Sequence, residues 1–297
     1  MSVVYGKFPN LKKFFQTLVE YIASSMQVMS IMQFGDIALD DFSPKYSKID
    51  VIVILEKSLW EKDFDLIDDI MLRIQKTYPD YSRNLNLYFI PSQLIENPRI
   101  SYQDFEGMII SSDNQVLISK YPFTATQDFQ IRKYNETLYG DNFKETFPIP
   151  PTDCFWMDFV KGLEELEKDV KEYPFQLSND ASDEKAINRL LNLTQTIYSL
   201  KKNDFIGKTK SAYWFANEYP SNLGDFILEV GLSRLRNTST SNIISLVEKS
   251  REFFLFFIDE VFQIRGIKTP DFKKTVKISD STHDFTFVFM EIRNMLQ

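Results

Sequence analysis

The chain has 297 residues, of which 43% are hydrophobic, and a formal net charge of −8. This length supplies the core of one large domain or of two domains of ordinary size. The negative charge argues against nucleic-acid binding through a basic face, because neutralising phosphates requires clustered Lys and Arg. A neutral or cationic partner fits the charge better, although mild acidity is also ordinary in cytosolic proteins.

Two scarce residue types exclude further classes of site. Cys154 is the only cysteine and His283 is the only histidine. An intramolecular disulfide, a cysteine-based zinc site and a histidine-rich metal site are therefore excluded. Aromatic and apolar residues follow Cys154 directly, and this context favours a buried, inert thiol over a nucleophile.

The N-terminal stretch does not have the pattern of a signal peptide. Lys7, Lys12 and Lys13 interrupt its apolar residues. No apolar run approaches the ~20 residues that a membrane span requires. We therefore expect a cytoplasmic protein without a membrane partner.

The first 90 residues predict alternating helices and strands. Apolar residues recur at helical spacing over residues 8–26, a compact apolar strand covers residues 27–34, and Gly35 ends it. A short helix is then expected to start over Asp36 to Leu39. The β-branched run 49–55 is the strongest strand signal, and it follows a turn-rich segment.

After this strand, Ser58 is expected to cap a helix that runs to Lys76, and residues 84–90 alternate as the next strand. The order of these elements favours a mixed sheet covered by helices. Three prolines near residue 150 then mark a boundary, because proline fits neither a helix interior nor a central strand.

The second half predicts a helical bundle, with helices at residues 153–173, 182–202, 208–218, 221–234 and 240–265. We thus expect an α+β fold with domains at 1–150 and 151–265, followed by an extension at 266–297. The apolar tail fits either a strand or a helix. The run Phe253–Phe257 is apolar on every side of a helix, so we expect burial within the chain or against a protein partner or second copy.

The informative motif is a stretch of twenty residues that begins where the first predicted strand ends. The stretch Phe34–Val53 reads FGDIALDDFSPKYSKIDVIV. It resembles the nucleotidyltransferase superfamily signature, in which an apolar residue and Gly-Ser precede Asp-x-Asp on a strand. Glycine lets the backbone approach phosphates, and alternate strand residues turn two carboxylates to one pocket. In that superfamily the carboxylates hold Mg²⁺.

The second half of the chain indicates a particular family within this superfamily. The runs NRLLNLTQTIY (188–198), DFIGK (204–208) and SAYWFA (211–216) are similar to the helical domain of streptomycin/spectinomycin adenylyltransferases. LYG (138–140) is similar to that family's domain junction. The resemblance covers about residues 25–260. It implies ATP and Mg²⁺ as cofactors and transfer of AMP to a hydroxyl of an aminoglycoside-like substrate.

Several positions depart from the pattern that the resemblance implies. Asp36 replaces the phosphate-loop serine, Lys48 replaces the first metal aspartate, and Asp50 alone remains of the pair. The expected base falls at Asn86, and an amide cannot take a proton. The phosphate-binding arginine of the helical domain falls at Gln195. The lysine of similar role is kept as Lys208, so the expected nucleotide-binding set is Gly35, Asp36, Lys48 and Lys208.

Lys48 is the most damaging departure, because an ammonium repels a divalent cation by several kcal/mol at ~4 Å and an effective dielectric of ~20. An alternative alignment makes Asp50 the first carboxylate and Ile52 the second, and it also leaves one carboxylate. Asp36, Asp40 and Asp41 are near in sequence, but they lack a strand's i, i+2 geometry.

Three hypotheses follow. The first is a catalytically impaired protein that binds a nucleotide, a small cationic ligand or a protein. The second is an active nucleotidyltransferase that works with one metal ion or a relocated base. The third is a protein-interaction role for the phenylalanine-rich C-terminal region, including a homodimer.

Overall fold

The computed structural model describes residues 3–96, 107–110, 116–119, 121–172, 180–236, 243–268 and 283–296. The chain forms two compact units, Met1–Cys154 and Phe155–Gln297. Each unit is described by itself below.

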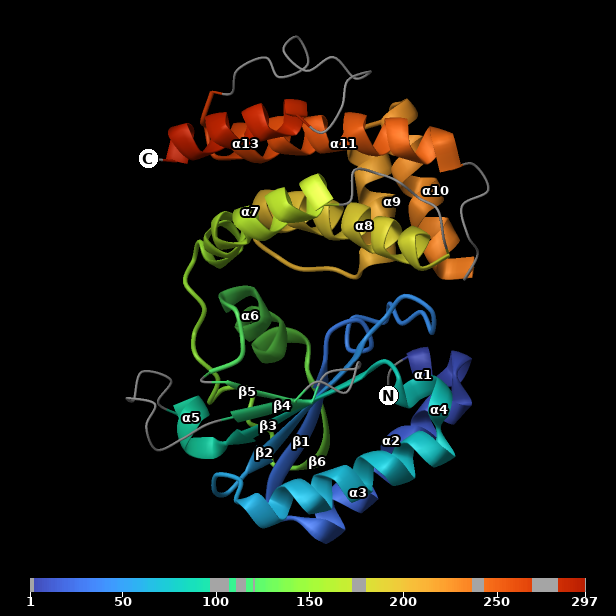
Figure 1. Ribbon diagram of the computed structural model, residues 1–297, viewed down its shortest axis with the longest axis vertical. Coiled ribbons are helices and arrows are strands. Elements are labelled where there is room, and N and C mark those ends of the chain that lie inside the picture. Colours follow the sequence, from blue (N-terminus) through green and yellow to red (C-terminus); the bar gives the residue numbers. More distant parts are fainter. Residues whose placement is uncertain are drawn as a thin grey trace. The chain divides into compact units, whose positions relative to one another are not determined.

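The first unit combines a sheet with helices (Figure 1). Its elements in chain order are α1 (Val3–Lys7), α2 (Pro9–Ser25), β1 (Val28–Phe34), β2 (Ile49–Leu55), α3 (Glu61–Thr77), α4 (Pro79–Ser82), β3 (Leu85–Pro91), α5 (Ser92–Glu96), β4 (Gly107–Ile110), β5 (Val116–Ser119), α6 (Ala125–Tyr134) and β6 (Glu136–Gly140).

The strands form one mixed sheet in the order β5-β4-β3-β2-β1-β6. Strands β2 and β3 are parallel, with Asp50 opposite Asn86, and every other neighbouring pair is antiparallel. On β1, Phe34 lies opposite Asp50. The central position of β2 agrees with its nearly uninterrupted apolar sequence, since a central strand is covered on both faces.

Each face of the sheet has its own apolar core, as the alternation of strand side chains requires. Val51 and Val53 of β2 pack with α2 and α3 on one face. Ile52 and Ile54 pack on the other face with Ile131 of α6. Asp50 has the same parity as Ile52 and so belongs to the α6 face.

Two local predictions for this unit are wrong. Residues 35–40 form turns instead of a helix, and Asp40 has a positive φ of 54° that no helix continues. Ser58 does not cap the next helix. Helix α3 begins at Glu61 after Trp60, whose backbone N–H donates to the Asp63 carboxylate at 2.7 Å. The acid three residues ahead, rather than the serine, fixes where this helix starts.

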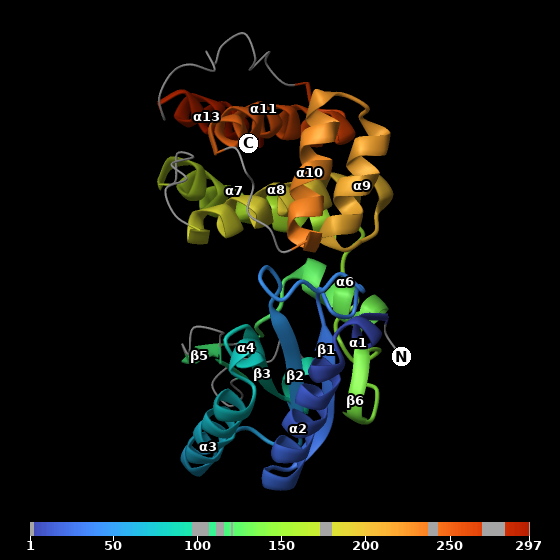
Figure 2. The same ribbon diagram turned by 90° about the vertical axis from the view of Figure 1, so that its right-hand side faces the viewer.

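The second unit is helical within its described residues. Its helices are α7 (Cys154–Glu172), which begins at the last residue of the first unit, and α8 (Asp180–Lys202), α9 (Lys208–Glu218), α10 (Asn222–Arg236), α11 (Ile243–Ile264) and α13 (His283–Leu296). Helices α9 and α10 lie side by side (Figure 2). They approach closely at Gly231, where a Cβ would meet the Cβ of Ala212 at 2.6 Å.

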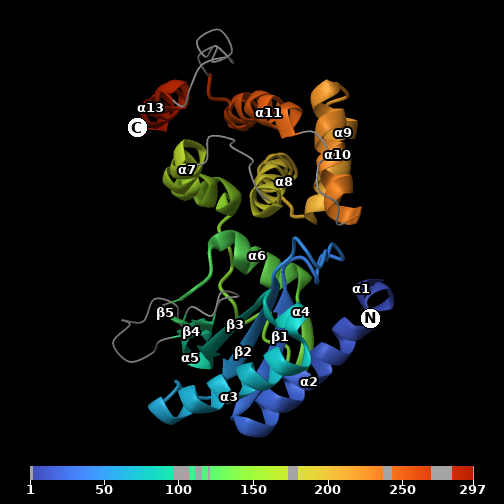
Figure 3. The ribbon, with the colours of Figure 1, turned by 45° about the vertical axis from the view of Figure 1, so that its right-hand side comes forward.

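Helices α7 and α8 form one layer of this unit, and α11 and α13 form the next (Figure 3). Phe257 of α11 packs on Phe159 of α7 with ring centroids 5.8 Å apart. Phe254 packs on Phe289 of α13 at 5.7 Å. The tail therefore contains a helix, and its contacts cover the phenylalanine stripe of α11 inside the unit.

The predicted α+β fold with a helical second half is confirmed. The Cys154 thiol is buried, as its neighbours predicted. Within the described part of the chain, no helix combines the length and the apolar character that crossing a membrane demands.

Candidate functional site

The predicted motif brings Gly35 and Asp50 into contact at the edge where β1 ends and β2 begins. Gly35 has a positive φ of 72°, which side chains rarely adopt. A Cβ at Gly35 would lie 2.9 Å from Oδ2 of Asp50. Glycine is therefore required at this position both by backbone conformation and by the close approach of the carboxylate.

The Asp50 carboxylate accepts hydrogen bonds from two side chains of β3. The Asn86 amide Nδ2 donates to Oδ1 of Asp50 at 2.8 Å, across the parallel register of β2 and β3. The Tyr88 hydroxyl donates to the same oxygen at 3.3 Å. The predicted base position and the surviving acid thus form one cluster, with the amide serving as a donor and not as a proton acceptor.

Tyr88 is a residue of this cluster that the motif comparison missed. Burial raises the pKa of Tyr88 well above its usual range, and the neighbouring Asp50 carboxylate raises it further. The phenol therefore stays protonated and remains a donor at neutral pH. Its signal in the sequence is its spacing, because residues 86 and 88 of one strand point to the same face.

Aromatic rings close the site on the α6 side of the sheet. The Tyr88 ring centroid lies 5.2 Å from that of Phe123 and 5.7 Å from that of Phe34. Phe123 in turn contacts Tyr121 at 5.5 Å, and the Tyr121 hydroxyl hydrogen-bonds to the buried Asp128. The site therefore has a rigid apolar wall with one further carboxylate behind it.

The remaining motif residues of the first unit lie in the loop between β1 and β2. The loop is held by a hydrogen bond from the Ser43 backbone N–H to Ser47 Oγ and by one from Asn84 to the Pro44 carbonyl. Lys48 directly precedes β2 and is exposed.

The three aspartates of this loop occupy different environments. Asp36 is half-buried and Asp40 is exposed, whereas Asp41 is buried. The Asp41 backbone N–H donates to the Asp36 carbonyl at 2.9 Å. All three lie outside the strand positions that carry the family's carboxylates.

Two further motif residues belong to the second unit. Lys208 is the first residue of α9 and is half-buried. Gln195 of α8 is buried, and its Nε2 donates to the Ile206 carbonyl at 2.6 Å. Gln195 thus fastens the loop that leads into α9, a structural task that an amide performs at the predicted arginine position.

The residues around Asp50 do not fit the Mg²⁺ pair that the motif implies. Such a pair is held by carboxylates that share one pocket. Here Oδ1 of Asp50 already accepts two hydrogen bonds, and positions 48 and 86 carry an ammonium and an amide. Among the described residues, no group of three or more His, Cys, Asp or Glu side chains is arranged to hold a metal ion.

We compared the chain with family models, curated proteins and solved structures. No family model and no curated protein matches the chain. The crystal structure of spectinomycin adenyltransferase from Enterococcus faecialis with ATP and spectinomycin aligns with 83% of this chain and 99% of that chain, with a TM-score of 0.55 and 17% sequence identity. CdnC from E. coli MS115-1 with ATP aligns with 86% of this chain and 90% of that chain, at 12% identity and a TM-score of 0.24.

The first of these likenesses shows that the chain has the nucleotidyltransferase fold of spectinomycin adenyltransferase. The resemblance seen in the sequence is thereby confirmed at the level of the fold. The TM-score of the CdnC alignment is too low to support any conclusion. What the site does is a separate question, since one fold supports many functions.

Proposed function

We propose that this chain uses its nucleotidyltransferase fold to bind a nucleotide or a small cationic ligand, without efficient nucleotidyl transfer. The observation that carries the proposal is the hydrogen bonding of Asp50 to Asn86 and Tyr88. The carboxylate is satisfied by side chains of the protein, and the amide at the base position cannot accept a proton from a substrate hydroxyl.

Two features support a nucleotide as the ligand. The fold neighbour named above was solved with ATP, and the motif keeps glycine at position 35, where the backbone has a positive φ and no Cβ blocks its surroundings. An exposed ammonium at Lys48 supplies positive charge at the edge of the sheet without a metal ion. A small cationic ligand is the alternative that the net charge of −8 favours.

Titration of ATP into the protein by calorimetry, once with excess Mg²⁺ and once with EDTA, tests this proposal. We expect equal affinities in the two titrations, because Lys48 takes the place of the metal. The Lys48→Met variant should then weaken ATP binding roughly tenfold, or about 1.4 kcal/mol. Lys57→Met, which removes another exposed lysine after β2, is the matched control and should leave the affinity unchanged.

Saturable ATP binding that requires Mg²⁺ would contradict the proposal, since it would mean that a functional metal site survives. Absence of ATP binding in both titrations would exclude a nucleotide as the ligand, and a small cationic ligand or a protein would remain as candidates. Loss of affinity in the Lys57 control equal to that in the Lys48 variant would show only a general effect of net charge.

The second candidate function is transfer of AMP from ATP to a hydroxyl of an aminoglycoside-like substrate. It is favoured by the retention of Asp50 on β2 beside Gly35. Incubation with ATP, Mn²⁺ or Mg²⁺ and spectinomycin, followed by mass spectrometry, detects the adenylylated product. An active enzyme should lose this product in Asp50→Ala and keep it in Asp65→Ala, which changes an exposed acid of α3.

The wider setting is also a proposal. The single cysteine, which rules out an intramolecular disulfide, supports a cytoplasmic location. A protein partner or homodimer through the C-terminal region has less support than the ligand proposals. In α11, Phe253, Phe254 and Phe257 are buried and Phe256 is half-buried, so few of these rings remain for a partner.

A further inference from the structure

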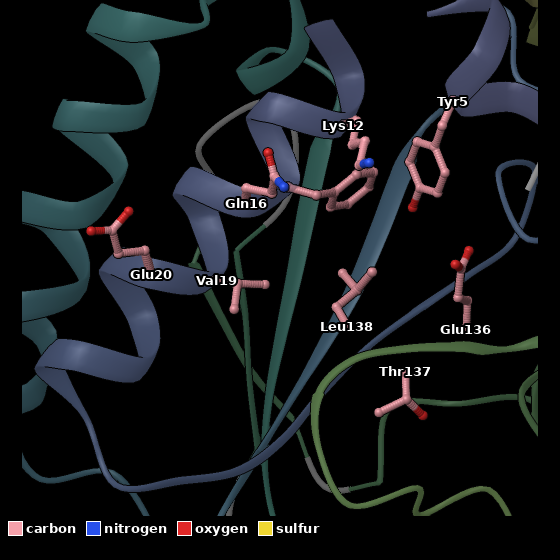
Figure 4. A pocket seen from close by; sticks show the side chains of 9 residues that line it. Tyr5, Lys12, Gln16, Val19, Glu20, Glu136, Thr137 and Leu138 are labelled. Carbon is pink, nitrogen blue, oxygen red and sulfur yellow. The ribbon is translucent and has the colours of Figure 1, made fainter. Parts of the chain in front are cut away.

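A pocket lies in the first unit, between helices α1 and α2 and strand β6 (Figure 4). Its volume is about 430 Å³, which is within the range of small-molecule sites. Tyr5 and Phe15 of its wall belong to the core on the Val51 face of the sheet. Asp50 bonds to Tyr88 on the opposite face, so the pocket is separate from the site described above.

The body of the pocket is apolar. Val19 of α2 and Leu138 of β6 lie near each other in the wall (Figure 4), and Phe15 of α2 also lines the pocket. Phe15 is further fixed by edge-to-face packing against Tyr5, with ring centroids 6.0 Å apart. Such walls accommodate a short aromatic or aliphatic group of a ligand.

Three buried side-chain oxygens in or near the wall of this pocket have no hydrogen-bond partner among the described residues. They are the Tyr5 hydroxyl, Oε1 of Gln33 and Oγ1 of Thr137. Gln33 is fully buried and Tyr5 is 8% exposed. Leaving a buried polar atom unpaired costs about 1–3 kcal/mol. Tyr5 lines the cavity, whereas Gln33 does not, and Thr137 lies opposite Met32, which belongs to the core on the other face of the sheet. A ligand in the cavity would supply a partner for the Tyr5 hydroxyl.

A carboxylate accompanies these oxygens. Gln33 Nε2 donates to Oε2 of Glu136 at 2.6 Å, which fixes the amide so that its Oε1 is the free end. Figure 4 shows the Glu136 carboxylate and the Tyr5 hydroxyl pointing toward each other across the pocket. Burial and the Glu136 carboxylate hold the pKa of Tyr5 well above its usual range, and the Gln33 amide opposes this rise. The phenol is therefore neutral.

We propose that this pocket binds a primary amine carried on a short aromatic or aliphatic body. The Glu136 carboxylate and the Tyr5 hydroxyl line the pocket, and the carboxylate accepts hydrogen bonds and carries negative charge, so the ligand head must donate hydrogen bonds and carry positive charge. An ammonium group has three donors for these oxygens. The Glu136 carboxylate makes no ion pair with any described residue, so it is available to this head.

Lys12 of α2 also lines the pocket and would favour an anionic head instead. Glu20 of the same helix lies on the wall as well, so the carboxylates outnumber the ammonium. The structure therefore favours the cation, and an anionic ligand is a distinguishable outcome of the experiment below. This proposal does not rest on the function proposed for the Asp50 site.

Calorimetric titration at pH 7 with three ligands of similar shape tests the proposal. The probes are 2-phenylethylamine, 2-phenylethanol and 3-phenylpropanoate. We expect saturable binding of the amine, roughly tenfold weaker binding of the alcohol, and no binding of the carboxylate. ATP, the probe of the other site, is expected not to compete with the amine.

Matched variants assign the binding to this pocket. Glu136→Gln is expected to weaken amine binding at least tenfold, whereas Glu56→Gln, an exposed acid after β2, should have no effect. Tyr5→Phe should weaken amine binding, because it removes the hydroxyl that lines the pocket. Val19→Trp, which fills the pocket, should abolish binding in a folded protein.

Several results would overturn the proposal. Equal affinities for the amine and the alcohol would indicate an apolar cavity without charge recognition. Preference for 3-phenylpropanoate would mean that Lys12 sets the specificity, and absence of binding by all three probes would mean that the pocket has no such ligand.

Discussion

Replacement of Gly140 by alanine is expected to lower the free energy of unfolding of the first unit by about 2–5 kcal/mol. Gly140 ends β6 with a φ of +70°. A Cβ at this position would lie 2.0 Å from the Met29 carbonyl oxygen and 3.2 Å from Cα of Ser30, both in the backbone of β1. Backbone atoms cannot rotate away, so the pairing of β6 with β1 must shift.

Urea unfolding followed by circular dichroism measures this effect, and two other glycines separate its causes. Gly266 has the same φ of +70°, but no atom lies within 4 Å of a Cβ built on it. Gly266→Ala should therefore cost only the backbone term, about 1–2 kcal/mol. Gly162 is within α7 and also has open space, so Gly162→Ala should stabilise by up to about 1 kcal/mol. Equal losses of unfolding free energy in Gly140→Ala and Gly266→Ala would show that the structure adjusts around the new Cβ and avoids the clash with β1.

The elements that were predicted closely are those whose local pattern and tertiary environment agree. β2 was predicted at residues 49–55 and has these bounds, because a β-branched run suits a strand buried on both faces. Helix α9 was predicted at residues 208–218 and also matches. Gly207 before it and the end of the apolar period after it mark both limits without help from distant residues.

The elements that were missed depend on partners far along the chain. β6 is half-buried and short, and it is defined by its pairing with β1 more than 100 residues earlier. Thr124 and Gln127 form a capping box for α6, a local signal in the sequence that the predicted elements did not use. Whether the tail forms a strand or a helix was open, because its apolar residues fit both, and packing on α11 decides for a helix.

The candidate site was predicted in part for a similar reason. Spacing alone placed Asp50 on a strand, and alternation placed Asn86 on a second one, but only the parallel register of β2 and β3 brings them to 2.8 Å. The pocket at Tyr5 could not be predicted, because the residues that line it come from α1, α2 and β6. No short stretch of sequence contains that combination.

Introducing the residues of the nucleotidyltransferase motif that the sequence resembles is expected to create a metal site that the parent chain lacks. The variant carries Asp36→Ser, Lys48→Asp and Asn86→Glu together. The Asp50 carboxylate then has acidic neighbours at positions 48 and 86, in place of an ammonium and a hydrogen-bonding amide. Three carboxylates at one sheet edge repel one another without a cation, and Mg²⁺ relieves that repulsion. We expect ATP affinity at least roughly tenfold higher with Mg²⁺ than with EDTA, a difference of about 1.4 kcal/mol.

Thermal unfolding and calorimetry together test whether the triple variant has gained a metal site. Mg²⁺ should add to the rise in melting temperature that ATP causes in the triple variant but not in the parent, because only the variant is expected to bind ATP more tightly with the metal ion. Adding Asp50→Asn to the triple variant should remove the Mg²⁺ dependence, since the one acid inherited from the parent is then lost. A triple variant that folds and still ignores Mg-ATP would show that the hydrogen-bonded cluster at Asp50 is not a former metal site. The functional ligand of this fold would then have to be sought elsewhere, beginning with the pocket at Tyr5.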